Sequence, residues 1–163
     1  MMISHSSHEE AVMELKASNL NDVREFLVHD LQKFDLVSAG HGWSLYKTLL
    51  HCAQTIEFSM SGYPKLRPLI IRRTVGRIVL KKFLKNNKMK HDLTAPVPGA
   101  AEIADEGNIS EAVAVTVKTI DDFMSYSGQY KEHLLFGKLS KKEYDEYFTL
   151  HYADHFSDYQ NMK

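Results

Sequence analysis

The chain has little cysteine, almost no excess charge of either sign and no long hydrophobic run, and each absence excludes a class of protein. A single cysteine, Cys52, cannot form a disulfide within the chain, which fits a reducing compartment. With 20 basic and 21 acidic residues, the net charge of −1 creates no overall field that favours nucleic acid or an anionic membrane. No apolar run approaches the roughly 20 residues of a transmembrane helix, so we expect no membrane partner.

The first residues also lack the pattern of a secretion signal. A signal peptide has a basic start followed by an apolar block, whereas residues 1–10 are mostly polar. Together with the single cysteine, this predicts a cytoplasmic protein of bacterial type. The remaining composition is ordinary for a globular protein, with 44% hydrophobic and 25% charged residues, and 163 residues suffice for one domain with a sizeable core.

Helical spacing recurs along the chain, while the period-two alternation that marks strands is rare. We expect a polar lead-in over residues 1–18 and a single helical domain over residues 19–163. The expected helices cover about residues 19–34, 44–62, 68–83, 108–126 and 140–159. Residues 86–108, which hold two prolines and two glycines, form the one long loop. The pattern predicts an all-α fold in which the helices pack antiparallel as a bundle.

Polar residues mark the starts of several expected helices. Asn19 and Ser44 stand where N-caps are expected, and Asn108 precedes Glu111 with the spacing of a capping box. Ser140 likewise begins the capping box Ser-Lys-Lys-Glu before the last helix.

Two histidines, His151 and His155, lie four residues apart in the last expected helix. Residues at i and i+4 share one face of a helix, so both imidazoles can reach one ion, and imidazole is the commonest ligand for transition metals. On a helical wheel the pair lies in the middle of an aromatic, inward face. Burying a polar group without a hydrogen bond costs about 1–3 kcal/mol, which a metal would relieve. The alternative is two unrelated histidines bonded to tyrosine hydroxyls or water.

A catalytic metal site usually has three protein ligands and an open position, and His51 in the second expected helix is the candidate for the third ligand. His51 lies roughly opposite the main apolar stripe of that helix, which runs through Leu45, Leu49, Ala53, Ile56 and Met60. Periodicity alone therefore favours a surface position for His51. Only a helix contacted on two sides, or a site at the end of the bundle, would bring it inside.

Two stretches resemble a known family. Residues 51–64, HCAQTIEFSMSGYP, and residues 133–140, HLLFGKLS, followed by the helix with His151 and His155, are similar to the DinB-like (YfiT-type) superfamily of bacterial proteins of unknown function. The likeness spans roughly residues 43–160. It implies a DinB-like four-helix bundle, often a homodimer, that holds a divalent metal on three histidines. One of these is on the second helix and two are at i and i+4 on the last, which correspond here to His51, His151 and His155.

The chain departs from the family pattern at two places. The family commonly has His-Pro where this chain has His133 and Leu134, and it commonly has adjacent histidines after an aspartate, where this chain has Asp154, His155 and Phe156. The superfamily is also catalytically diverse, because some members use low-molecular-weight thiols and many have no known activity. Likeness of fold does not choose among these activities.

Two further residues are candidates for a catalytic role. Glu57 follows His51 by six residues on the same helix and could orient a histidine or act as a general base, the alternative being a solvated glutamate. His133 precedes the last helix and could contact substrate, the alternative being a histidine on a surface loop. Cys52 should point about 100° away from His51, and we interpret it as a core residue.

Residues 65–90 are rich in basic side chains, a pattern that can hold phosphate backbones. Because the whole chain is nearly neutral, we interpret this run as a solvated helix face, and nucleic acid is not the expected partner. An acidic cofactor or substrate drawn to this face is the alternative.

Three neutral imidazoles suit zinc, nickel, iron or copper better than magnesium or calcium. We therefore expect a divalent transition metal, zinc, nickel or iron, as the cofactor. Such an ion acts as a Lewis acid or lowers the pKa of a bound water or thiol. The predicted function is a metal-dependent hydrolase or thiol transferase acting on a small molecule. The alternative is a non-catalytic helical-bundle binding protein with an empty or vestigial metal site.

Overall fold

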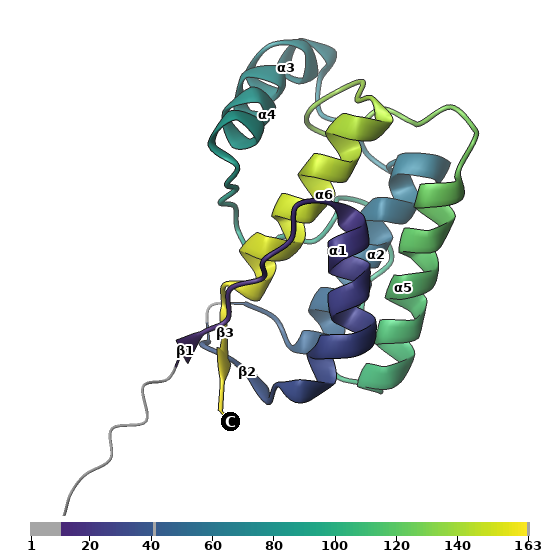
Figure 1. Cartoon of the computed structure of the whole chain (residues 1–163). Coiled ribbons are helices and arrows are strands. Elements are labelled where there is room, and N and C mark those ends of the chain that lie inside the picture. The colour runs from purple at the N-terminus through teal and green to yellow at the C-terminus, as the bar shows by residue number, and fades with distance from the viewer. Residues whose placement is uncertain (1–10, 41, 163) are drawn as a thin grey trace, which may run out of the picture.

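The structure, a computed structural model, describes residues 11–40 and 42–162, and this part of the chain is mainly helical (Figure 1). Its α-helices are Leu20–Glu25 (α1), Leu45–Ser61 (α2), Leu69–Arg73 (α3), Val75–Asn86 (α4), Ile109–Ser125 (α5) and Lys141–Phe156 (α6). A π-helical turn, Phe26–Asp30 (η1), and a 3₁₀ turn, Leu31–Lys33 (η2), continue α1. The strands are Ala11–Val12 (β1), Leu36–Ser38 (β2) and Tyr159–Asn161 (β3).

Side-chain caps begin α1, α2, α5 and α6 at the residues that the sequence predicts. The side-chain oxygens of Asn19, Ser44, Asn108 and Ser140 each accept a hydrogen bond from the backbone N–H three residues later, at 3.0 to 3.2 Å. Glu143 completes a capping box at α6, because its carboxylate accepts from the backbone N–H of Ser140 at 2.9 Å. These bonds satisfy N–H groups that have no partner inside the helix, which is why the chain turns helical at these points.

The prediction of one continuous helix over residues 68–83 is wrong, because the structure has two helices there, α3 and α4. The division lies at Thr74, whose φ of −117° and ψ of −92° are not helical. Gly76 in the first turn of α4 lies against the backbone carbonyl of Leu135. The approach is so close that a Cβ atom on residue 76 would overlap the carbonyl oxygen. The break therefore lets α4 approach the turn that precedes α6.

Helices α1, α2, α5 and α6 lie side by side (Figure 1). The expected antiparallel packing holds for α2 and α6, because Thr48 near the start of α2 contacts Tyr159 just beyond the end of α6 at 2.8 Å. It is wrong for α2 and α5. Thr116 donates to the Leu49 carbonyl and the hydroxyl of Tyr126 donates to the carbonyl of Met60, so these helices run parallel. Residues 62–108, which hold α3 and α4, are long enough to return the chain to the end where α2 began.

The all-α expectation describes most of the structure but misses a small antiparallel sheet with the order β1-β3-β2. The last helix ends at Phe156, not near Tyr159 as predicted, and Tyr159 begins the middle strand β3. The Tyr159 hydroxyl donates to the Trp43 carbonyl at 2.8 Å. Strands of two or three residues are too short to show alternation in the sequence, so only the pairing partners reveal them.

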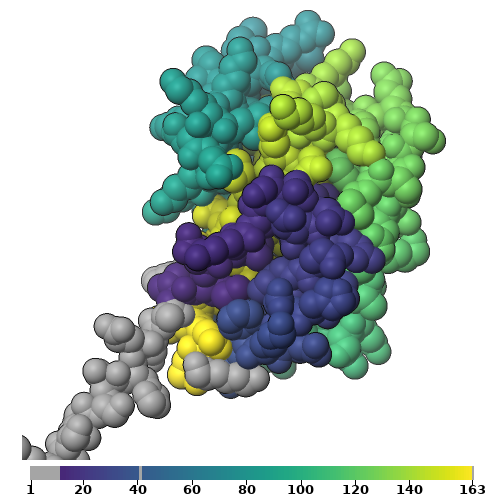
Figure 2. Space-filling model, in the orientation of Figure 1, coloured from purple at the N-terminus to yellow at the C-terminus, as the bar shows by residue number. Residues whose placement is uncertain are grey.

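Residues 11–18 pack against the helical part of the chain. Met13 and Leu15 are buried, and Figure 2 shows the segment that follows β1 lying across α6. This part of the predicted lead-in therefore belongs to the packed unit, whereas residues 1–10 lie outside the described residues.

In the described part of the chain, we find no helix with both the length and the apolar character needed to cross a bilayer.

Candidate metal centre

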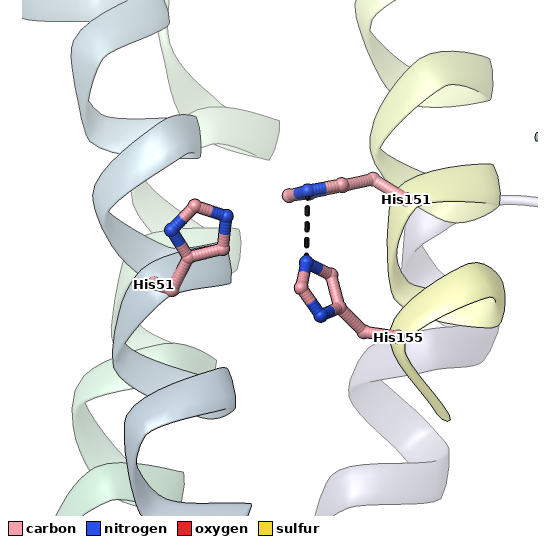
Figure 3. A group of neighbouring side chains, drawn as sticks. All are labelled: His51, His151 and His155. Carbon is pink, nitrogen blue, oxygen red and sulfur yellow. Dashed lines mark hydrogen bonds between the residues drawn. The ribbon is translucent and has the colours of Figure 1, made fainter. Parts of the chain in front are cut away.

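Helices α2 and α6 bring three imidazoles together in the interior of the molecule (Figure 3). His51, His151 and His155 are only 4%, 2% and 2% exposed, and one ring nitrogen of each lies within 4.8 Å of those of the other two. The Nε2 atoms of His151 and His155, one turn apart on α6, are separated by 3.2 Å. The structure thus assembles the three predicted ligands into a group that could hold a metal ion.

His51 is buried because α2 is contacted on two sides, by α5 and by α6. Its ring lies 5.0 Å from that of Trp43 and 5.3 Å from that of His151, measured between centroids. The surface position favoured by periodicity is therefore wrong. The second buried face of α2 carries His51, Thr55 and Ser59. A helical wheel that marks only apolar residues does not identify this face as buried, because its residues are polar. The hydroxyls of Thr55 and Ser59 donate to carbonyls of their own helix.

The spacing of the ring nitrogens fits ligands of a single ion. Two metal–nitrogen bonds of about 2.0–2.1 Å at a tetrahedral angle place their nitrogens roughly 3.3 Å apart, close to the 3.2 Å between His151 and His155. Among the described residues, Nε2 of His151 and Nε2 of His155 contact only other imidazole nitrogens, so their lone pairs face one another and not a fixed donor such as a hydroxyl. This donor set, three imidazoles without a carboxylate, fits a divalent transition metal.

Burial keeps these imidazoles neutral. Burial, with a smaller effect from His91, lowers the pKa of His51 to about 4. Burial and the neighbouring His51 and His91 lower the pKa of His155 to about 2, and the pKa of His151 also falls well below its ordinary value, mainly through burial. Neutral imidazole is the form that binds metals. At neutral pH the ligands therefore need lose no proton before a metal binds.

A fourth imidazole, that of His91, was not among the predicted ligands and reaches the cluster from the loop over residues 86–108. Nε2 of His91 lies 3.2 Å from Nε2 of His155. The ring of His91 is centred 4.9 Å from that of His151 and 4.8 Å from that of His155. Asp154 fixes its position, because Oδ2 accepts from ring Nδ1 at 2.6 Å and from the backbone N–H of His91 at 2.9 Å. A loop histidine has no periodic signal, so only the fold reveals it.

The two predicted catalytic candidates occupy different environments. Glu57 is exposed on α2 and is not brought to the buried cluster. His133 is buried, and its Nδ1 accepts the backbone N–H groups of Leu135 at 3.1 Å and Phe136 at 3.2 Å. Its ring lies 4.9 Å from that of Tyr147, which in turn stacks on His151 at 5.7 Å. His133 is thus a neighbour of the cluster, one aromatic ring away.

A cavity of about 260 Å³ adjoins the cluster, with His51, His91 and His151 in its wall. Most of the remaining wall is apolar and comes from α4, from the loop over residues 86–108 and from the turn before α6: Val79, Phe83, Met89, Val97, Leu135 and Phe136. Among the described residues that line it there is no carboxylate, and the only permanently charged side chain is the exposed Arg67. The loop therefore covers part of the candidate site, and a small molecule in the cavity would contact the imidazoles.

Cys52 and the basic segment do not contribute to the cluster. Cys52 is fully buried, as predicted, and burial raises the pKa of its thiol. In the basic segment, Arg77 forms an ion pair with Glu143 at 2.8 Å, and Arg72 pairs with Glu132. Exposed lysines occupy the outer surface of α4.

Comparison with known proteins gives a family but no activity. Neither the curated proteins nor the solved structures include a match to the chain. One family model matches residues 9–162, which is nearly the whole chain and includes all four histidines of the cluster. The chain therefore belongs to the family described as "Protein of unknown function (DUF1569)".

Proposed function

We propose that this protein is a DinB-like, metal-dependent enzyme that acts on a small molecule, either as a hydrolase or as a thiol transferase. The observation that carries the proposal is the convergence of three buried, neutral imidazoles beside a cavity. His51, His151 and His155 would hold a divalent transition metal, zinc, nickel or iron.

The arrangement of helices supports a DinB-like four-helix bundle formed by α1, α2, α5 and α6. The ligands come from the second and the last of these helices, as the family resemblance implies. The residue order is also as implied, with one ligand on α2 and a pair at i and i+4 on α6.

A metal ion on three imidazoles would supply a Lewis acid and lower the pKa of a bound water or thiol. The chain's own residues prepare the surroundings. The apolar wall from Val79, Phe83 and Phe136 would bind the body of a substrate and exclude water. Because none of the described residues that line the cavity carries a carboxylate and Arg67 is one of them, a neutral or anionic substrate would be favoured over a cationic one.

The metal site can be tested by measuring the metal content of protein purified without a histidine tag. We expect about one equivalent of zinc, nickel or iron per chain, and loss of that metal in His155→Ala. His29→Ala is the matched control, because His29 is exposed and pairs with Glu25, away from the three proposed ligands. Protein that is metal-free and cannot be reconstituted with any of the three ions would contradict the proposal and favour a non-catalytic binding protein.

Trp43 offers a second measurement on the same site. It is the only tryptophan in the chain, and its ring stacks on that of His155 with centroids 6.3 Å apart. Nickel bound by the cluster should therefore quench the tryptophan fluorescence in a saturable titration. The quenching should be lost in His155→Ala and retained in His29→Ala.

A further inference from the structure

We infer that His91 is a fourth ligand of the metal centre, carried by the loop over residues 86–108 and oriented by Asp154. In this arrangement the loop would cover the side of the metal ion that faces the cavity. The inference rests on the proposed metal site, and it adds a device that controls access to that site.

The hydrogen bonds of His91 fix which ring nitrogen is free. An ionised carboxylate can only accept, so the 2.6 Å contact between Nδ1 and Asp154 places the ring proton on Nδ1. In the neutral ring, which is the form that binds metals, Nε2 then carries the lone pair, and it is this atom that faces His155. Carboxylate–imidazole pairs of this kind orient histidine ligands and raise their basicity in metal sites.

In its distance to His155, His91 resembles the predicted ligand His151. Nε2 of His155 lies 3.2 Å from Nε2 of His151 and also 3.2 Å from Nε2 of His91. Both values match the roughly 3.3 Å expected between two ligands of a tetrahedral ion. If Nε2 of His155 carried a proton, that one proton would have to be shared between Nε2 of His151 and Nε2 of His91. A metal ion placed between the rings would instead accept a lone pair from each nitrogen that faces it.

The loop is held in place by more than His91. Met89 and Val97, on either side of it in sequence, are buried, and both line the cavity. Asp154 adds the bond to the backbone N–H of His91 at 2.9 Å. Four imidazoles would fill a tetrahedral site, so a substrate atom could bind the ion only if His91 leaves or the ion becomes five-coordinate. In the first case His91 would act as an exchangeable ligand that the substrate displaces.

Cobalt(II) is a suitable probe because it can replace zinc and shifts the NMR signals of ligand imidazoles far from the diamagnetic region. Counting shifted imidazole N–H signals counts ligands, and that of His91 should be protected from exchange by Asp154. We expect four such signals in the wild type and three in His91→Ala, with one cobalt bound to each. His29→Ala, at an exposed histidine, should retain four. Asp154→Asn should weaken cobalt binding by about 10- to 100-fold.

The outcomes separate this inference from the proposed function. Three signals in the wild type that persist unchanged in His91→Ala would overturn the inference and leave the three-histidine site intact. A wild type that binds no cobalt would overturn both. His91 lies on a loop and is partly exposed, and urea unfolding of the metal-free variant beside the wild type checks that the fold is kept.

Discussion

At the scale of single residues, the cluster shows why buried histidines remain neutral here. The rings of His51, His151 and His155 lie 4.7 to 5.3 Å apart between centroids, so protonation of one would place its charge against the others. Burial acts in the same direction, because it removes water from the charged form. The result is a set of free lone pairs, which is the condition for binding a metal at neutral pH.

His133 allows the effect of burial on pKa to be measured at a buried histidine that is not one of the proposed ligands. Burial lowers its pKa to about 3, whereas an unfolded histidine has a pKa of about 6.5. Below pH 6.5 His133 therefore takes up one proton in the unfolded chain that it lacks in the folded one, and this contribution lowers the free energy of unfolding by about 1.4 kcal/mol per pH unit until the pH nears 3.

We expect His133→Asn to lower stability at pH 7, because the backbone N–H groups of Leu135 and Phe136 lose their present acceptor. The difference from the wild type should then narrow by about 1.4 kcal/mol per pH unit between pH 6 and pH 4. Urea unfolding of metal-free protein at pH 7, 6, 5 and 4 measures it. A difference that stays constant with pH would show that His133 does not remain neutral in the folded state.

At the scale of elements, helix starts are predictable from sequence because a cap depends on residues three apart. Ser140 and Glu143 are an example, and the structure confirms their capping box. Helix direction and strand pairing depend on contacts between distant segments. The parallel run of α2 and α5 and the pairing of β3 with β1 and β2 therefore leave no local pattern.

The residues of the candidate site also differ in whether local sequence patterns predict them. His151 and His155 can be predicted because both lie on one helix at a fixed spacing, and that spacing alone puts them on one face. His51 required the family resemblance, because its buried face on α2 is polar and periodicity counts only apolar residues. His91 lies in a loop without periodicity, and only the folded chain brings it to Asp154.

Gly76 tests how closely α4 packs against the turn before α6. A Cβ at this position would lie 1.9 Å from the Leu135 carbonyl oxygen, and that oxygen belongs to backbone that cannot rotate away. Glycine to alanine inside a helix ordinarily stabilises by about 0.5–1 kcal/mol.

For Gly76→Ala we expect destabilisation in place of this usual stabilisation. Gly76→Ala should lower the free energy of unfolding by about 1–3 kcal/mol, the usual cost of overpacking. Lys82→Ala, at an exposed position of the same helix, is the control and should change stability by less than about 0.5 kcal/mol. Urea unfolding of the two variants decides, and a more stable Gly76→Ala protein would mean that α4 can move away from the turn.

At the scale of the whole molecule, the imidazoles join segments that are far apart in sequence. α2, the loop over residues 86–108 and α6 each contribute to one small volume, so a metal there would link them only in the folded state. Without a metal, the same volume holds imidazole nitrogens that, among the described residues, contact only one another, such as Nε2 of His151 and Nε2 of His155. Stability without metal and the capacity to bind it are therefore opposed at this site.

His151→Leu should show this opposition in a single pair of measurements. Leucine is apolar and of similar size, so the metal-free variant should be at least as stable as the metal-free wild type, by analogy with other buried polar groups replaced by apolar ones. Zinc at a free concentration 100-fold above its Kd should stabilise the wild type by about 2.7 kcal/mol and leave the variant unchanged. His29→Leu, at an exposed position, should respond to zinc like the wild type. Thermal unfolding with and without zinc measures both effects, and a metal-free His151→Leu protein that is markedly less stable would show that His151 serves the fold and not only the metal.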